Sequence, residues 1–127
     1  MTLAQLEHAI RAACEVCEDS EIWIFGSQAI LGEFPNAPEA LRASIEVDVQ
    51  PKNQSDNVDV IDGLLGELSL FHQTHGFYVH GLLIKEAATL AQGWEKRANP
   101  VVISKSELSA FYRFELIHRC AFISGAF

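Results

Sequence analysis

Apolar residues recur at helical spacing from the start of the chain, and this pattern predicts an amphipathic helix that ends near residue 17. Thr2 and Gln5 fit a capping box, in which Thr2 caps the amide of Gln5 and the Gln5 side chain reaches back to the amide of Thr2. A polar turn over residues 18–21 follows the helix. The apolar face is made of Leu3, Leu6, Ile10, Ala13, Cys14 and Cys17.

Two segments after this helix have the patterns of strands. Residues 22–25 are apolar without a break, as expected for a strand buried on both faces. Residues 44–49 alternate polar and apolar, which predicts a strand with one face toward the core. Gly26-Ser27 ends the first of these strands and opens a helical segment over 28–32. The core-facing residues of the second strand are expected to be Ile45, Val47 and Val49.

The stretch between these strands and the second half of the chain continue the alternation of helices and strands. A loop over 33–38 precedes a helical turn over 39–43, and a polar loop over 51–57 precedes a second amphipathic helix. Residues 77–84 and 101–103 are strand candidates, with a turn over 92–94 between them, and a capped helix is expected over 104–118. The apolar face of the second amphipathic helix contains Val58, Ile61, Leu64, Leu65 and Leu68.

The order of these elements predicts one domain over residues 1–127, of the α/β (α+β) class, with a small mixed sheet flanked by helices. No internal repeat, linker or low-complexity tract divides the chain. A length of 127 residues is ordinary for a single domain with its own core.

Composition narrows the classes of function. The chain has 9 Lys and Arg against 17 Asp and Glu, a net charge of −8, which argues against strong binding to duplex nucleic acid. No apolar run approaches the roughly 18 residues of a membrane span, so no membrane association is expected. Residues 1–5 lack the basic and apolar start of a secretory signal, and the 3 cysteines do not suggest a disulfide framework. These features predict a cytoplasmic protein.

Two carboxylates follow the glycine-serine turn and are the best candidates for chemistry. Glu46 and Asp48 lie at positions i and i+2 of a strand, so their side chains point to the same side with Cα atoms roughly 6.5–7 Å apart. Such a pair of hard oxygen ligands suits Mg²⁺, which completes its shell with waters and phosphate oxygens. Gly26 allows a phosphate to approach the backbone, and the Ser27 hydroxyl and the amides that open the following helix can donate to it.

Residues 25–32, Phe-Gly-Ser-Gln-Ala-Ile-Leu-Gly, followed by Glu-Val-Asp-Val at 46–49, resemble the nucleotidyltransferase superfamily. The resemblance covers about residues 21–97 and is closest to small bacterial nucleotidyltransferase-like proteins, some of which belong to toxin–antitoxin systems. It implies a nucleotidyltransferase-like fold with residues 98–127 as a divergent or shortened C-terminal helical segment. It also implies that Gly26 and Ser27 hold the phosphates of a nucleoside triphosphate, while Glu46 and Asp48, the catalytic residues, bind Mg²⁺ for nucleotidyl transfer to an acceptor hydroxyl.

A difference from the superfamily pattern keeps a second function open. Active members place a third carboxylate on a later strand, whereas the matching segment here, residues 77–84, contains no Asp or Glu. Glu86, Asp59 and Asp62 are poor substitutes by sequence position. The alternative is a catalytically inactive nucleotidyltransferase-fold protein that acts by protein–protein interaction, for example in a toxin–antitoxin pair. The sequence names neither the nucleobase nor the acceptor or protein partner.

Three further groups of residues have structural and functional interpretations. Cys14 and Cys17 form a Cys-x-x-Cys near the end of a helix, where cysteines packed as small apolar residues are favoured over a redox or zinc site. Residues 72, 75 and 80 are histidines, which suit surface positions or a metal site; on its strand, His80 can point to the same cleft as Glu46 and Asp48. Aromatic residues near the C-terminus favour helix packing or a contact with a second copy, as in a homo-oligomer: Phe111, Tyr112, Phe114, Phe122 and Phe127.

Overall fold

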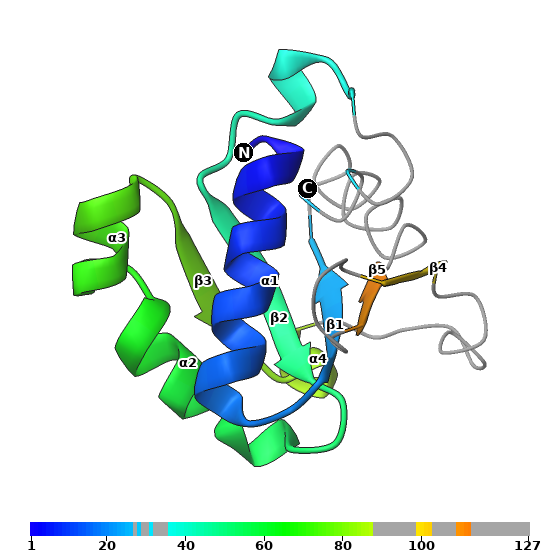
Figure 1. The fold of residues 1–127 in the computed structure, drawn as a ribbon, viewed down its shortest axis with the longest axis vertical. Helices are drawn as coiled ribbons and strands as arrows, with labels where there is room; N and C mark the ends of the chain where they lie inside the picture. The colour runs from blue at the N-terminus through cyan, green and yellow to red at the C-terminus, as the bar shows by residue number, and fades with distance from the viewer. Residues whose placement is uncertain (27, 29–30, 32–35, 88–98, 103–108, 113–127) are drawn as a thin grey trace.

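The computed structural model describes residues 1–26, 28, 31, 36–87, 99–102 and 109–112, and these form a mixed α/β arrangement (Figure 1). The first half of the chain contains helix α1 (Leu3–Cys17), strand β1 (Glu21–Phe25), a 3-10 turn at Glu39–Leu41 and strand β2 (Glu46–Pro51). A second 3-10 turn, Ser55–Asn57, leads into helices α2 (Val58–Leu65) and α3 (Leu70–His75). Strand β3 (Tyr78–Gly81), helix α4 (Ile84–Ala87) and strands β4 (Asn99–Val102) and β5 (Ser109–Tyr112) complete the order.

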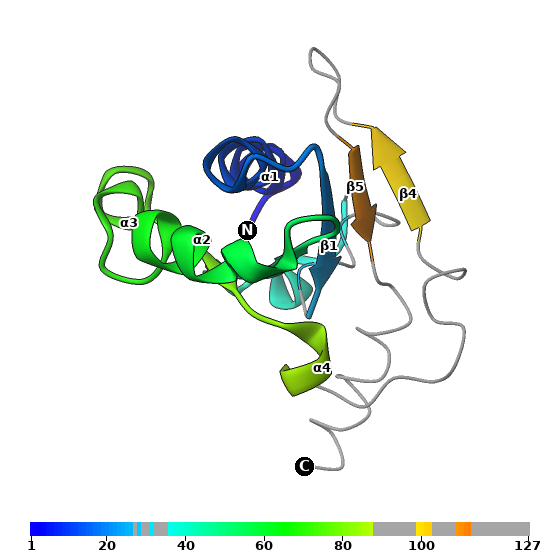
Figure 2. The same cartoon turned by 90° about the horizontal axis from the view of Figure 1, so that it is seen from below.

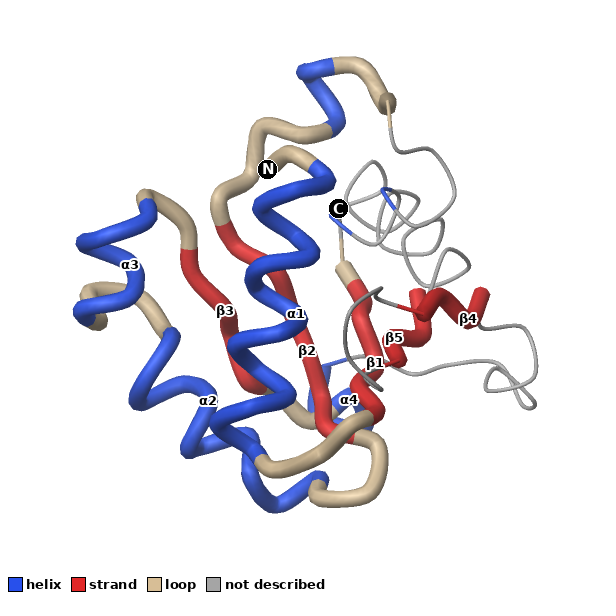
Figure 3. The backbone as a smooth tube through the Cα atoms, in the orientation of Figure 1, coloured by secondary structure: helices blue, strands red, loops and turns tan. Residues whose placement is uncertain are grey.

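The five strands form one mixed sheet in the order β3-β2-β1-β5-β4, which confirms the predicted fold class. Strand β1 pairs antiparallel with β2 and parallel with β5, β2 pairs parallel with β3, and β4 is antiparallel to β5. Strand β2 therefore lies between β1 and β3 (Figure 3). The register places Phe25, Asp48 and His80 in one row across these three strands.

Helix α1 forms as its sequence predicts. The Thr2 hydroxyl accepts a hydrogen bond from the Gln5 amide at 3.2 Å, and the Gln5 side chain accepts one from the Thr2 amide at 2.8 Å, so the capping box is confirmed. Its apolar face packs on the sheet together with α2 and supplies much of the core. The core residues of α1 are Leu6, Ala9, Ile10, Ala13, Cys14 and Cys17.

The alternation predicted for the second strand is correct for two of its three apolar residues. Val47 and Val49 are 1% and 0% exposed and lie in the core, whereas Ile45 is 47% exposed. The prediction for Ile45 was wrong because the strand begins only at Glu46, two residues later than the pattern suggested. The carbonyl of Ile45 still accepts a hydrogen bond from the Tyr78 amide at 2.9 Å, so the backbone is held while the side chain faces water.

The second amphipathic helix is shorter than predicted. Helix α2 ends at Leu65, where the Gly66 amide donates to the Asp62 carbonyl, and Ser69 then caps the separate helix α3. Leu64 and Leu68 are therefore 56% and 76% exposed instead of joining the core. Strand β3 ends at Gly81, before the predicted end at residue 84, and a Cβ on Gly81 would stand 2.1 Å from the Val58 carbonyl oxygen, so α2 begins directly against this strand.

The C-terminal part differs most from the sequence prediction. A strand was expected at 101–103, and β4 confirms it at 101 and 102. The prediction of a helix over 104–118 was wrong at residues 109–112, which form β5 and pair in parallel with β1. Backbone pairing with β1 there outweighs the helical spacing of the side chains. The remainder of that predicted helix, most of the segment 28–32 and the turn at 92–94 lie outside the described residues.

Helices cover both faces of the sheet around β1 and β2. Helices α1 and α4 lie on opposite sides of the sheet (Figure 2). The Ile84 amide at the start of α4 donates to the Gln50 side chain at 2.7 Å, which fastens α4 to the face of β2 that does not carry the core valines. Among the described helices, none is both long and apolar enough to cross a membrane.

Candidate functional site

The candidate site lies on the face of β2 and β3 opposite the core. Because Val47 and Val49 point into the core, the period of two along β2 turns Glu46 and Asp48 to the other face. Strand β3 runs parallel in register, with Tyr78 opposite Glu46 and His80 opposite Asp48. Four polar side chains from two neighbouring strands therefore stand next to one another on a single sheet surface.

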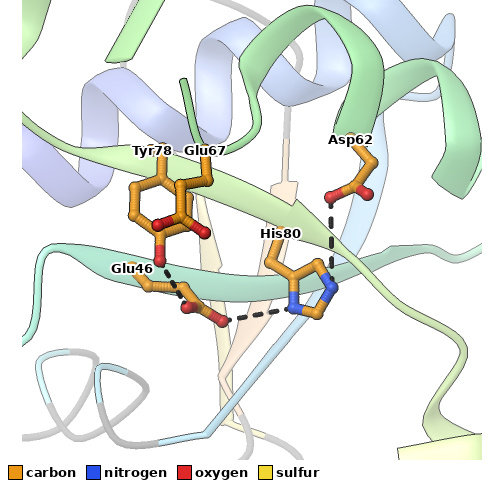
Figure 4. Close-up of a pocket in the computed structure, with 5 residues that line it drawn as sticks. All are labelled: Glu46, Asp62, Glu67, Tyr78 and His80. Atoms are coloured by element: carbon orange, nitrogen blue, oxygen red, sulfur yellow. Dashed lines mark hydrogen bonds and ion pairs between the residues drawn. The ribbon is translucent and has the colours of Figure 1, made fainter. Parts of the chain in front are cut away.

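His80 contacts both strand carboxylates, and Figure 4 shows its contact with Glu46. Its Nδ1 lies 3.2 Å from Glu46 Oε1 and 3.2 Å from Asp48 Oδ1, so one ring nitrogen stands between the two predicted carboxylates. The sequence-based expectation that His80 points to the same cleft as Glu46 and Asp48 is confirmed. The side chains of His80, Glu46 and Asp48 are 38%, 35% and 25% exposed, so the group is open to solvent on one side.

Tyr78 fixes the orientation of Glu46. The Tyr78 hydroxyl donates a hydrogen bond to Glu46 Oε2 at 2.7 Å, which leaves Oε1 toward His80. This hydrogen bond to a carboxylate raises the pKa of Tyr78 to about 12, because loss of the phenolic proton would place two negative charges together. Sequence reasoning missed Tyr78, although its position two residues before His80 on one strand was a signal that both share a face.

The two carboxylates differ in their readiness to ionise. Burial and the neighbouring Glu46 raise the pKa of Asp48 to about 7. Burial also opposes ionisation of Glu46, but hydrogen bonds from Asp48 and Tyr78 and the nearby His80 hold the pKa of Glu46 below its usual value. At pH 7 Asp48 is thus about half protonated while Glu46 is ionised, as expected where two carboxylates share a small space.

Gly26 adjoins the same carboxylate. It has a positive φ of 79°, and a Cβ built on it would lie 2.6 Å from Asp48 Oδ2. Glycine is the residue that adopts this backbone conformation without strain, and here it also leaves the room that Asp48 occupies. The structure therefore brings the predicted glycine turn and the predicted carboxylate together, while Ser27 lies outside the described residues.

Two more acidic side chains, Asp62 from α2 and Glu67 from the segment after it, lie beside His80 and Glu46. Asp62 Oδ1 lies 3.9 Å from His80 Nε2, on the ring edge opposite the two strand carboxylates. An open pocket of about 220 Å³ is lined by Glu46, Asp62, Glu67, Tyr78 and His80. The sequence position of Asp62 made it a poor substitute for a third catalytic carboxylate, and the structure places it beside His80, because the close contact of α2 with Gly81 carries this helix over β3. Neither Asp59 nor Glu86 lines the pocket.

The group can hold a divalent cation. Glu46, Asp48 and His80 each offer one ligand atom, and these atoms lie within 4.8 Å of one another. Metal–ligand bonds of about 2.1 Å at right angles place donor atoms about 3.0 Å apart, close to the 3.2 Å measured from His80 Nδ1 to each carboxylate. Two carboxylates and an imidazole thus fit a metal, and the donor set alone does not single out Mg²⁺.

The other candidate groups do not join this site. Cys14 and Cys17 are free thiols that are 2% and 0% exposed in the core, which agrees with their interpretation as small apolar residues. His72 accepts a hydrogen bond from the Leu68 amide at 2.9 Å, and the His75 ring packs on His8 at 4.5 Å between centroids. Within the described part of the chain, only Glu46, Asp48 and His80 form a group of three or more potential metal ligands.

Comparison with protein-family models, with curated proteins and with solved structures finds no match to this chain.

Proposed function

We propose that this protein binds a nucleoside triphosphate together with a divalent cation and transfers a nucleotidyl group to an acceptor hydroxyl, as a nucleotidyltransferase-like protein of the cytoplasm. The observation that carries the proposal is the meeting of Asp48 with the glycine turn, where a Gly26 Cβ would stand 2.6 Å from the carboxylate. A cation held by Asp48 lies next to the backbone that would receive the phosphates.

The negative charge of the pocket supports binding of the cation before the triphosphate. Its lining contains three carboxylates, Glu46, Asp62 and Glu67, and Asp48 adjoins it, while no Lys or Arg is among the residues described as lining it. A bare triphosphate would be repelled by these groups, so a cation has to neutralise them first. When bound, Mg²⁺ would stabilise negative charge on the phosphate oxygens and orient the reacting groups.

The chain's own residues have separate parts in this proposal. Glu46 and Asp48 hold the cation, and the Tyr78 hydroxyl keeps Glu46 turned toward it. Gly26, and with it Ser27 as the resemblance implies, receives the phosphates beside Asp48. The sheet fixes the relative positions of these groups because Gly26 directly follows Phe25, which pairs with Asp48 in the antiparallel ladder.

Calorimetric titration with ATP, CTP, GTP and UTP, with and without Mg²⁺, tests the proposal. We expect at least one triphosphate to bind only when the cation is present and Asp48→Asn to abolish this binding. Asp56→Asn is the matched control, since Asp56 lies in the exposed turn before α2 and outside the site. Absence of binding to every triphosphate, or equal binding by Asp48→Asn, would refute the proposal.

A second function, of another class, is favoured by exposed leucines in the last turn of α2 and in the segment that follows it. Leu64, Leu68 and Leu70 are 56%, 76% and 78% exposed, although they lie within seven positions of one another. Exposed apolar residues that form a patch are typical of interaction sites. If no triphosphate binds, we expect an inactive nucleotidyltransferase-fold protein that acts by protein–protein interaction, in a toxin–antitoxin pair or a homo-oligomer. Light scattering of the wild type and Leu68→Asp tests the homo-oligomer.

A further inference from the structure

Both nitrogens of the His80 ring face carboxylates, an arrangement that suits a histidine bound to a cation. Nδ1 lies 3.2 Å from Glu46 and 3.2 Å from Asp48, and Nε2 lies 3.9 Å from Asp62. A histidine that serves only as a surface group has no need of acidic partners at both edges. Metal-binding histidines, in contrast, commonly present one nitrogen to the metal and the other N–H to a carboxylate.

We propose that His80 is the third protein ligand of the cation through Nδ1, with Asp62 as the carboxylate that orients its ring, and that the site prefers Mn²⁺ or another first-row transition ion to Mg²⁺. This inference rests on the proposed metal-dependent function and specifies which ion serves it. A cation can bind only an unprotonated Nδ1, so a proton carried by that nitrogen leaves to solvent on binding.

The geometry requires little movement. Nδ1 is equidistant from Glu46 Oε1 and Asp48 Oδ1, so a cation bound to these three atoms replaces two existing contacts. Tyr78 already holds the other oxygen of Glu46 at 2.7 Å, and Gly26 packs against the other oxygen of Asp48. Both carboxylates are thus oriented before the cation arrives.

The donor chemistry decides the preference. Mg²⁺ favours an all-oxygen shell, whereas imidazole suits Mn²⁺, Fe²⁺, Co²⁺ and Zn²⁺ progressively better. His80 sits directly opposite Asp48 in the β2–β3 register, where a carboxylate would have made the site all-oxygen. The residue type at this one strand position therefore sets which cation the pocket favours.

Asp62 acts through His80 and is a positioning residue. Its side chain is 50% exposed and 3.9 Å from Nε2, and it approaches the ring from α2 on the side away from Glu46 (Figure 4). Once Nδ1 is bound to a cation, Nε2 carries the proton, and Asp62 Oδ1 at 3.9 Å can accept that N–H after a small approach. The N–H then directed at Asp62 fixes the rotation of the ring.

Electron paramagnetic resonance of bound Mn²⁺ tests the inference directly, because spin-echo modulation reports whether a nitrogen is coordinated. We expect one bound Mn²⁺ with nitrogen modulation in the wild type, loss of the modulation in His80→Ala with roughly 100-fold weaker binding, and about tenfold weaker binding in Asp62→Asn with recovery in Asp62→Glu. The control His75→Ala should bind as the wild type does. His80→Asp should bind Mg²⁺ relatively better, with a smaller ratio of Mn²⁺ to Mg²⁺ affinity.

The outcomes separate this inference from the proposed function. Mn²⁺ bound by Asp48 without nitrogen modulation, or an unchanged ratio of Mn²⁺ to Mg²⁺ affinity in His80→Asp, overturns the inference and leaves the proposed function standing. Failure of the wild type to bind Mn²⁺ also overturns it, and the triphosphate titration with Mg²⁺ then judges the proposed function separately. Circular dichroism of each variant shows whether it is folded, and His80→Gln repeats the ligand test if His80→Ala is not.

Discussion

Asp48 lies against Gly26 so closely that a Cβ on the glycine would stand 2.6 Å from Asp48 Oδ2. The contact joins residues 22 positions apart in the chain because Phe25, which precedes the glycine, is the ladder partner of Asp48. The contact couples the backbone conformation at Gly26 to the position of the Asp48 carboxylate. A substitution at either residue should therefore disturb the other.

We expect Gly26→Ala to disturb the carboxylate as well as the turn. Alanine in the left-handed conformation costs about 1–2 kcal/mol of stability, and its methyl group must displace the Asp48 side chain. Cation affinity should fall along with stability, as measured by calorimetry and chemical denaturation. In an Asp48→Ala background the clash is absent, so the same substitution should cost only the backbone strain; equal costs in both backgrounds would show that the contact has no energetic effect.

Asp48 should destabilise the metal-free protein at neutral and alkaline pH. Its folded-state pKa of about 7 lies above the ordinary 3.8, so the folded state holds a proton that the unfolded chain has lost, and stability falls as pH rises between these values. Asp48→Asn should therefore be more stable than the wild type above pH 7 by roughly 1–2 kcal/mol, and the difference should shrink toward pH 4. Denaturant titrations across this range provide the measurement.

A divalent cation should make the wild type more stable than Asp48→Asn. Bound only by the folded state, it stabilises the wild type, while Asp48→Asn lacks one of its ligands. At saturating Mn²⁺ and pH 7.5 we expect the melting temperature of the wild type to rise and that of the variant to stay nearly constant. Equal rises in both proteins would place the cation elsewhere.

Asp19 is expected to be a structural carboxylate with the opposite pH dependence. It is 5% exposed and accepts hydrogen bonds from the amides of Glu21, Asn53 and Gln54 and from the Asn53 side chain. Burial opposes its ionisation, but these four donors outweigh burial and hold the pKa of Asp19 below 3.8. Asp19→Asn should cost about 2–3 kcal/mol at pH 7. This cost should fall as the pH drops below about 4, where protonation removes the advantage of the carboxylate; Asp56→Asn should show neither effect.

The thiols of Cys14 and Cys17 should be unreactive in the folded protein. Burial, with the nearby Cys17 and Asp19, raises the pKa of Cys14 to about 12, and burial also raises the pKa of Cys17. In a Cys120→Ser variant, which leaves only these two thiols, we expect almost no reaction with a disulfide reagent under native conditions and full reaction in denaturant. Rapid labelling of the native protein would mean that the end of α1 opens readily.

The sequence by itself determined the elements whose signals are local. The capping box and the apolar face of α1, the buried strand β1, and the alternation that separates Val47 and Val49 from Glu46 and Asp48 all follow from side chains a few residues apart. It also indicated that His80 shares a cleft with the carboxylates, because strand periodicity is a local property. The nucleotidyltransferase resemblance remains a prediction.

Only the tertiary structure decided which elements meet and where each one stops. The segment at 109–112 is a strand because β1 offers it a partner, and Leu64 and Leu68 are exposed because the chain turns at Gly66. The approach of Val58 to Gly81 brings Asp62 to His80, and the β1–β2 register sets Asp48 beside Gly26. These contacts depend on backbone pairing and close packing between distant segments, and no pattern along a single segment encodes them.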